Sequence, residues 1–323
     1  MAQSLPAQVD RSDPDLAIDR VVSVAKALAD GVRALVLRVL QGESYGVLEL
    51  CRIVDVAQPA LSHHLKVLHQ TGLVVRRREG NSLFYRRAPA PGDMEAALLA
   101  GIDQIPLGAE QLARIDAVHG ERRCRSEAFF TEHADDFARN QARISESGVY
   151  AASVMDIVQR HGIGDGTALE IGPGDGELLA ALAERFTRVV GIDSASAMLA
   201  RCRERVADAD NVRLMHRDFA ELPARRGYQL VLAAMVVHHL PSPQRFFHQA
   251  GRLLKRDGVL VVVELCSHDQ EWARPACGDL WLGFEPDELG RWAAQAGLHR
   301  EESQYLAQKN GFRIQIHTYT NPR

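Results

Sequence analysis

The chain has 323 residues, of which 46% are hydrophobic and 25% charged, and a formal net charge of −4. This length suits two domains, and the small net charge excludes a protein that is basic over its whole surface. No stretch approaches the roughly 18 apolar residues of a membrane span, and residues 1–15 lack the apolar run of a signal peptide. We therefore expect a cytoplasmic protein with a disordered segment at residues 1–15 and no membrane contact.

The five cysteines are scattered through the chain, and no two of them form a CxxC pair: Cys51, Cys124, Cys202, Cys266 and Cys277. An odd, scattered set argues against a disulfide framework. Sites built from several thiolates are also disfavoured, and we expect no metal site.

The first domain is expected over residues 16–90. Apolar residues recur at three- and four-residue spacing over residues 16–41, which predicts two helices broken at Asp30-Gly31. Further helices are predicted at residues 47–54 and 58–71. Residues 73–78 and 83–87 read as two strands joined by Glu79-Gly80-Asn81-Ser82, so an α+β domain ending in a β-hairpin is expected.

The helix at residues 58–71 has an inward apolar stripe of Leu61, Leu65 and Leu68 and a polar opposite face. Short polar side chains near a helix N-terminus can meet base edges in the major groove, and arginines on the following hairpin can contact phosphates. The candidate DNA-binding residues are Gln58, Pro59, Ser62, His63, Lys66, Arg76, Arg77, Arg78 and Arg86. The alternative is a helical interaction domain whose arginines only solvate the hairpin.

Residues 25–87 resemble the ArsR-type winged helix-turn-helix regulators. The resemblance rests on AKALADGVRALVLRVL and, more specifically, on QPALSHHLKVLHQTGLVVRRREGNSLFYRR, although Gly31-Val32 departs from the family pattern. It implies binding of double-stranded operator DNA by a homodimer. Some members sense metals through paired cysteines, but the corresponding helix holds only one cysteine, Cys51. A single thiol is a poor metal site, so we interpret Cys51 as a small buried apolar residue. His63 and His64 point in different directions and are equally poor ligands.

Helices predicted at residues 93–104, 108–130 and 132–145 make residues 91–145 a connector and dimerisation region. From residue 167 the pattern changes to short strands alternating with helices, which predicts an α/β Rossmann-like domain with a parallel sheet over residues 146–323. The strands are expected at residues 168–171, 189–192, 212–216, 230–234 and 259–264, the helices at 177–185, 195–207 and 243–254, and late edge strands at 304–306 and 312–318.

A glycine-rich turn, Gly172-Pro173-Gly174-Asp175-Gly176, follows the first of these strands. Its spacing departs from the dinucleotide fingerprint, because Glu177 occupies the third glycine position, so a pyrophosphate site is disfavoured. Glu170, just before the turn, can bind an ammonium group. Asp193 ends the next strand and can accept both ribose hydroxyls, and Asp218 ends the third strand and can accept from an adenine amino group. Together these groups describe S-adenosylmethionine.

Residues 151–318 resemble the class I S-adenosylmethionine-dependent methyltransferases through LEIGPGDGELL, GIDSASAML, RDFAEL and MVVHHL. The resemblance implies that Glu170, Gly172 and Gly174 hold the methionine end of S-adenosylmethionine or S-adenosylhomocysteine. It implies that Asp193 takes the ribose and that Asp218 and Phe219 take the adenine, with Ser194, Met198 and Ala234 also lining the cofactor. The alternative is a degenerate Rossmann-type fold that binds nothing.

His239, after the fourth strand, is the best candidate for a catalytic base, and its alternative is a hydrogen-bonded lining residue. Glu264, His268 and Asp269 follow the fifth strand and are expected to face the same pocket. Cys266 and Cys277 lie in a segment with two tryptophans that we interpret as a substrate pocket or a dimer contact. Thiol chemistry on arsenic is disfavoured, because no three-thiol site can be assembled.

The pairing of the two domains favours a transcriptional regulator whose C-terminal domain binds S-adenosylmethionine or S-adenosylhomocysteine as effector. The alternative is an active small-molecule methyltransferase whose DNA-binding domain regulates its own operon. Both functions need the cofactor, so the glycine turn and its acids do not separate them. A DNA methyltransferase is disfavoured, because AAMVVHHLP stands where an Asn-Pro-Pro-Tyr-like segment would be expected.

Overall fold

The computed structural model describes residues 14–79, 82–90, 92–145 and 148–322. Residues 1–13, within the segment that we expected to be disordered, and Gly80-Asn81 of the predicted hairpin turn lie outside the described residues. The chain divides into two compact units, Met1–Val118 and His119–Arg323. Among the described helices, none has the length and apolar character that crossing a membrane requires.

The first unit consists of helices and a small antiparallel sheet with strand order β1-β3-β2. Its elements are α1 (Pro14–Leu28), α2 (Gly31–Val39), β1 (Tyr45–Gly46), α3 (Val47–Val54), α4 (Gln58–Gln70), β2 (Val74–Glu79), β3 (Ser82–Arg87) and α5 (Asp93–Asp103). The predicted order of helices followed by a hairpin is confirmed. The β1 strand escaped prediction because two residues carry no alternating pattern.

Local sequence explains how these elements begin and pack. Asp30 caps α2 by accepting a hydrogen bond from the Arg33 backbone N–H at 2.9 Å, which separates α2 from α1. Leu61, Leu65 and Leu68 of α4 are each 0% exposed, as the apolar stripe predicts. The polar face of α4 is therefore left on the surface.

Helix α6 (Ala109–Ile144) contains the boundary between the two units. Ile115 and Val118 of its first part belong to the core of the first unit, and the rest of the helix belongs to the second. Non-helical backbone angles at His133 interrupt α6 with a kink, close to the break between the helices predicted at residues 108–130 and 132–145.

The second unit alternates helices and strands after α6. Its elements are α7 (Gly148–Arg160), β4 (Thr167–Ile171), α8 (Glu177–Ala183), β5 (Arg188–Asp193), α9 (Ser196–Arg205), β6 (Val212–His216), η1 (Phe219–Glu221), β7 (Tyr228–Ala234), η2 (Val237–His239), α10 (Pro243–Leu253), β8 (Leu254–Leu265), α11 (Ala273–Cys277), α12 (Pro286–Gln295), β9 (His299–Ala307) and β10 (Arg313–Thr320).

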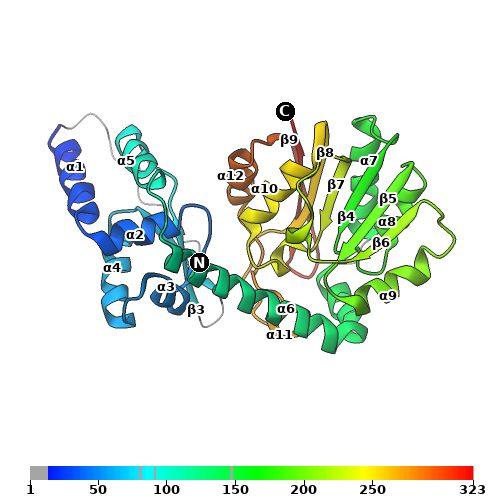
Figure 1. Cartoon of the computed structure of the whole chain (residues 1–323), viewed down its shortest axis with the longest axis horizontal. Coiled ribbons are helices and arrows are strands. Elements are labelled where there is room, and N and C mark those ends of the chain that lie inside the picture. Colours follow the sequence, from blue (N-terminus) through cyan, green and yellow to red (C-terminus); the bar gives the residue numbers. More distant parts are fainter. Residues whose placement is uncertain (1–13, 80–81, 91, 146–147, 323) are drawn as a thin grey trace. The chain divides into compact units, whose positions relative to one another are not determined.

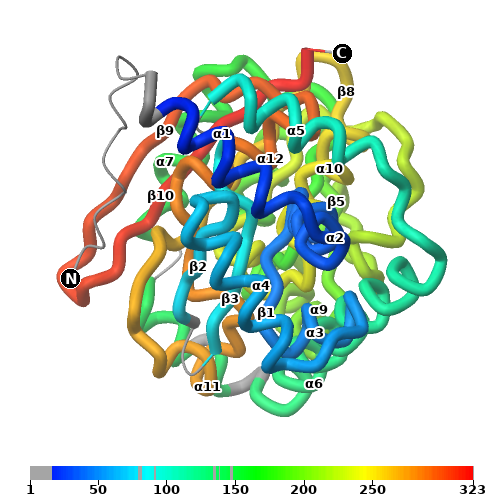
Figure 2. The backbone as a smooth tube through the Cα atoms, turned by 90° about the vertical axis from the view of Figure 1, so that its left-hand side faces the viewer, coloured from blue at the N-terminus to red at the C-terminus, as the bar shows by residue number. Residues whose placement is uncertain are grey.

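These strands form one seven-stranded sheet with the order β6-β5-β4-β7-β8-β10-β9. The first five are parallel, while β10 runs antiparallel to both β8 and β9. Helices α10 and α12 cover one face and α7, α8 and α9 the other (Figure 1). Figure 2 shows β9 and β10 side by side as the closing hairpin. The predicted Rossmann-like fold and its late edge strands are confirmed.

The order of the sheet determines where a ligand can bind. The chain moves outward from β4 to β5 and β6, then returns to the other side of β4 with β7 and β8. The carboxyl ends of β4 and β7 therefore lie at the point where the strand order reverses, which is the usual binding position in open parallel sheets.

Candidate functional site

The turn after β4 has the backbone that only glycine adopts without strain. Gly172 has φ +63° and Gly174 φ +56°, in the left-handed region that L side chains disfavour. A Cβ atom on Gly172 would lie 2.6 Å from Cγ2 of Val236 on the segment after β7. The turn is therefore a tight cradle at the end of the sheet.

Glu170 lies beneath this turn and is only 2% exposed. Its Oε2 atom has no hydrogen-bond partner among the described residues. Burial, with a further contribution from Asp175, raises the pKa of Glu170 well above its ordinary value. An unsatisfied carboxyl group in this position suits a cationic ligand group.

Asp193 is the last residue of β5, and Asp218 follows β6 as the N-cap of η1. Asp193 accepts a hydrogen bond from the Ala195 backbone N–H at 2.8 Å, and burial raises its pKa to about 6. Asp218 accepts from the Ala220 backbone N–H at 2.8 Å through Oδ1 and from Arg123 Nη1 at 3.0 Å through Oδ2. Each carboxylate therefore has a defined orientation in the site.

The sequence-predicted ligand residues of the second unit surround one cavity of about 310 Å³, a size that suits a small-molecule site. All nine line it, and so does the candidate base His239: Glu170, Gly172, Gly174, Asp193, Ser194, Met198, Asp218, Phe219 and Ala234. Their individual roles stay predictions. Sequence analysis missed a further wall, formed by residues of α6 and α7: Ser126, Phe130, Phe137, Gln141 and Tyr150.

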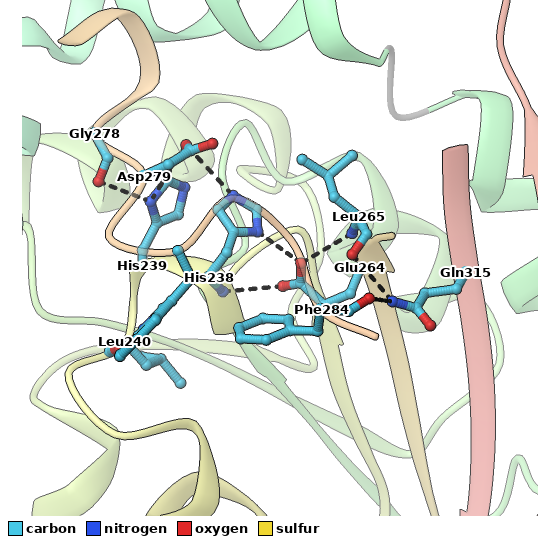
Figure 3. A network of polar contacts seen from close by, with 10 residues as sticks. His238, His239, Leu240, Glu264, Leu265, Gly278, Asp279, Phe284 and Gln315 are labelled. Atoms are coloured by element: carbon cyan, nitrogen blue, oxygen red, sulfur yellow. Dashed lines mark hydrogen bonds and ion pairs between the residues drawn. The ribbon is translucent and has the colours of Figure 1, made fainter. Parts of the chain in front are cut away.

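His239 lies at the end of η2, beside His238 in a buried polar network (Figure 3). His238 Nδ1 is 2.7 Å from Glu264 Oε2, and its Nε2 is 3.8 Å from Asp279 Oδ1. Although burial alone lowers it, the two carboxylates raise the pKa of His238 to about 9. His238 is therefore an imidazolium at neutral pH, and its Nδ1–H donates a hydrogen bond to Glu264 Oε2.

Burial, and then the charge on His238, hold the pKa of His239 well below its ordinary value, so His239 is neutral. Its Nδ1 is 3.3 Å from the Gly278 carbonyl oxygen, which can only accept, so Nδ1 carries the hydrogen and Nε2 a lone pair. The ring packs edge-on against Phe130 at 4.9 Å. Nε2 is buried without a hydrogen-bond partner among the described residues.

The other polar residues predicted to face the pocket lie elsewhere. The carboxylate of Glu264 is hydrogen-bonded to His238, and the ring of His268 packs against Phe312. Neither these residues nor Asp269 line the cavity that the described residues enclose. That expectation was wrong because Glu264 lies within β8 and bonds to His238, while the backbone N–H groups of Ser267 and His268 pair with the carbonyls of Phe284 and Leu282.

Ligand-type atoms of His238, His239 and Asp279 lie within 4.8 Å of one another. A charged His238 between Glu264 and Asp279 accounts for this closeness, because two buried carboxylates need a buried cation. The arrangement is thus explained by ion pairing within the chain.

The DNA-binding candidates lie on the surface of the first unit. Gln58, Pro59, Ser62, His63 and Lys66 are all exposed on α4. On the hairpin, Arg76 and Arg78 are exposed, whereas Arg77 and Arg86 are half-buried. Arg87, also within the basic stretch of the sequence, instead forms two hydrogen bonds with Asp103 at 2.6 and 2.8 Å.

Cys51 lies half-buried on α3. Burial raises the pKa of its thiol, which disfavours the thiolate that binds metals.

Two family models match separate parts of the chain. Residues 30–75 match the model of bacterial regulatory proteins of the arsR family, and residues 169–262 match a methyltransferase domain model. An uncharacterized helix-turn-helix regulator of Methanocaldococcus jannaschii is 34% identical over 70 residues, which are 21% of this chain and 76% of that protein. An arsenic resistance transcriptional regulator of Pseudomonas putida is 34% identical over 80 residues, 24% of this chain and 62% of that protein.

For the second unit, an uncharacterized methyltransferase of Mycobacterium bovis is 34% identical over 103 residues, 31% of this chain. The chain spans 51% of the length of that relative. Among solved structures, the Burkholderia thailandensis 1,6-didemethyltoxoflavin N1-methyltransferase with bound S-adenosylhomocysteine has a TM-score of 0.54 at 18% identity, covering 68% of this chain and 93% of that one. This likeness shows the fold. The chain therefore carries an arsR-family helix-turn-helix domain in its N-terminal part and a methyltransferase domain after it.

Proposed function

We propose that this protein is a DNA-binding transcriptional regulator whose methyltransferase domain binds S-adenosylmethionine or S-adenosylhomocysteine as its effector. The observation that carries the proposal is that a single helix, α6, contributes residues to both units. Ile115 and Val118 of this helix are part of the core of the first unit. Ser126 and Phe130, further along the same helix, line the cavity of the second.

The residues around the cavity fit the proposed effector. The buried, unsatisfied Oε2 of Glu170 suits the ammonium group of the methionine end, and the glycine cradle allows close approach of the backbone. Asp193, Asp218 and Phe219 all line the cavity, and in this proposal Asp193 accepts from the ribose hydroxyls while Asp218 and Phe219 hold the adenine. Of the three carboxylates, Glu170 is the buried one with an unsatisfied oxygen, so the ammonium group of such a ligand would remove the largest desolvation cost.

Operator DNA is the proposed partner of the first unit. The exposed face of α4 offers short polar side chains and Lys66 to a major groove, while Arg76 and Arg78 offer charge to phosphates. Sequence is then read by α4, and affinity and register come from the hairpin.

A homodimer is proposed from an apolar surface of the first unit. Ile18, Val21 and Val22 on α1 are 61%, 48% and 42% exposed, and Leu98 on α5 is 41% exposed. The hydrogen bond from Arg20 to Glu95, at 2.8 Å, holds α1 and α5 together. Exposed apolar side chains on two joined helices favour burial against a second copy.

The proposal is tested by fluorescence anisotropy with promoter DNA from the protein's own locus, titrated with each ligand separately. We expect a shift in DNA affinity of tenfold or more, about 1.4 kcal/mol of coupling. The Asp193→Ala variant serves as control, because it keeps the DNA-binding surface and removes the ribose contact. Equal DNA affinity with and without saturating ligand in the unaltered protein would contradict the effector function.

Methyl transfer to a small molecule is a second candidate, favoured by His239. Its neutral ring presents a buried Nε2 lone pair beside Phe130, on the cavity wall. S-adenosylmethionine, when bound, supplies a methyl group on a sulfonium. His239 would take the proton that an O–H or N–H acceptor loses, and the two phenylalanines, Phe130 and Phe137, would exclude water from it.

This candidate is tested by measuring S-adenosylhomocysteine formed from S-adenosylmethionine in the presence of fractionated small metabolites. We expect a fraction that stimulates turnover by the unaltered protein, and a loss of at least about 100-fold in His239→Gln with little change in cofactor affinity. If no fraction stimulates turnover, the methyl-transfer candidate fails and the effector function is the remaining proposal.

A further inference from the structure

The ion pair between Arg123 and Asp218 connects α6 to the part of the cavity that is proposed to hold adenine. Arg123 Nη1 donates to Asp218 Oδ2 at 3.0 Å. The other oxygen of the same carboxylate is occupied by the Ala220 backbone N–H at 2.8 Å. An adenine amino group bound to Asp218 must therefore share the carboxylate with Arg123.

Such sharing is chemically possible. An ionised carboxylate offers about four lone-pair sites, and two are used by these contacts. The side chain of Arg123 is 44% exposed and that of Asp218 is 22% exposed, so the pair is partly solvated and contributes little to the stability of the fold. A ligand can therefore strengthen or weaken this contact without unfolding the domain.

Other contacts fix the same helix to segments that follow β7 and β8. Arg122 donates to the Pro241 carbonyl oxygen at 3.0 Å and lies over the Trp281 ring at 4.8 Å. Asn140 donates to the Ala276 carbonyl oxygen at 2.8 Å. These acceptors are backbone atoms outside the residues that line the cavity, whereas Asp218 lines it directly. The Arg123 contact is thus the one of these three that a ligand can alter by direct binding.

We infer that Arg123 is a positioning residue of the effector site, and that its contact with Asp218 transmits occupancy of the adenine position to α6. The inference rests on the proposed effector function. Because α6 continues into the core of the first unit through Val118 and Ile115, a shift of α6 changes the packing beneath the DNA-binding helices. The contact biases the two DNA-binding states, as coupling requires.

The experiment measures a complete thermodynamic cycle on the full-length chain. DNA affinity is determined by anisotropy without ligand and at saturating S-adenosylmethionine or S-adenosylhomocysteine, and ligand affinity by calorimetry with and without DNA. Reciprocity requires the same coupling factor from both measurements. The variants are Arg123→Gln, Arg123→Lys, and Arg125→Gln as a matched control, since Arg125 is an exposed arginine on the same helix.

In the unaltered protein and in Arg125→Gln we expect coupling of about tenfold or more. Arg123→Gln should reduce the coupling to less than about twofold, and Arg123→Lys should restore part of it because it keeps the charge. Saturating ligand is used for each variant, so a weaker ligand affinity does not hide the coupling.

The outcomes separate the two proposals. If the unaltered protein shows no coupling, the effector function itself fails. If the unaltered protein is coupled and Arg123→Gln remains coupled to the same extent, the effector function stands and the role of Arg123 is overturned.

Discussion

The DNA-binding surface and the ligand cavity are built in opposite ways. The candidate DNA-binding residues come from one helix and one hairpin, close together in sequence, and the five on α4 are exposed. The cavity is lined by residues from Ser126 to Leu240, brought together by α6, α7 and the ends of several strands. The first site depends on summed charge, whereas the second depends on burial of a few carboxylates, so single substitutions should affect them unequally.

The largest single effect is expected at Asp193. Asp193→Ala removes the carboxylate that we propose to accept from two ribose hydroxyls, and each hydrogen bond to a charged group contributes about 1.5–3 kcal/mol. We expect cofactor affinity, measured by calorimetry, to fall at least about 100-fold. Asp208→Ala, an exposed acid after α9, is the control and should bind as the unaltered protein does. Unchanged binding by Asp193→Ala would show that the site is wrongly assigned.

An intermediate effect is expected on the hairpin. Arg76 and Arg78 are both exposed and alternate along β2 on one face. Their double replacement by alanine should weaken DNA binding about tenfold or more and reduce the slope of log affinity against log salt by about 1.8, since each lost phosphate contact removes about 0.9.

The matched control for the hairpin is Arg87→Ala. Arg87 is bonded to Asp103, so its loss should lower the midpoint of thermal unfolding but leave the salt slope unchanged. If Arg87→Ala flattens the slope and the double variant does not, the assignment of phosphate contacts on the hairpin is reversed.

The pH dependence of ligand binding should be smaller and specific to the cavity. Burial raises the pKa of Asp193 to about 6 in the free protein, whereas ribose hydroxyls donate to the carboxylate and so favour its charged form. Affinity should therefore be full above pH 6 and fall as the pH drops below 6, by up to about tenfold per pH unit. Calorimetry at pH 7.5 and 5.0 measures the change in ligand affinity. DNA affinity at low salt, measured at the same two pH values, is the comparison for an effect specific to the cavity.

Asp193→Asn is the control for the pH effect, since an amide does not titrate. Asp193→Asn should bind the ligand more weakly, and its affinity should lack the part of the pH dependence that comes from titration of Asp193. A pH dependence of the same size in Asp193→Asn would assign the titration to another group, of which Glu170, with its raised pKa, is the nearest candidate.

The same contrast explains what sequence could predict. The exposed face of α4 that we propose for DNA binding followed from helical periodicity, because Leu61, Leu65 and Leu68 define the buried side of α4 and hence the exposed one. The acids proposed to bind the ligand could be placed because the carboxyl ends of parallel strands meet at one edge of the sheet. Both inferences use local pattern together with one general rule of geometry.

The α6 wall of the cavity could not be predicted, and the reason is physical. The spacing of Phe130 and Phe137 indicates one face of a helix, but not which distant surface that face covers. The contact from Arg123 to Asp218 joins residues 95 positions apart, and no local pattern encodes such a pairing. Arg87 illustrates the same limit, because its position among the hairpin arginines suggests a DNA contact, whereas in the structure it forms an ion pair with Asp103.

The smallest effect is expected at Cys51, and it tests whether the first unit also contains a buried, chemically selective site. Metal-binding thiols act as thiolates, and burial raises the pKa of Cys51. Its helix, α3, holds no second cysteine to share a soft ion. We therefore expect arsenite or Zn²⁺ to change DNA affinity less than about twofold, and Cys51→Ala to behave as the unaltered protein does. A metal-dependent loss of DNA binding that disappears in Cys51→Ala would overturn this expectation and make the first unit a sensor in its own right, independent of the cavity.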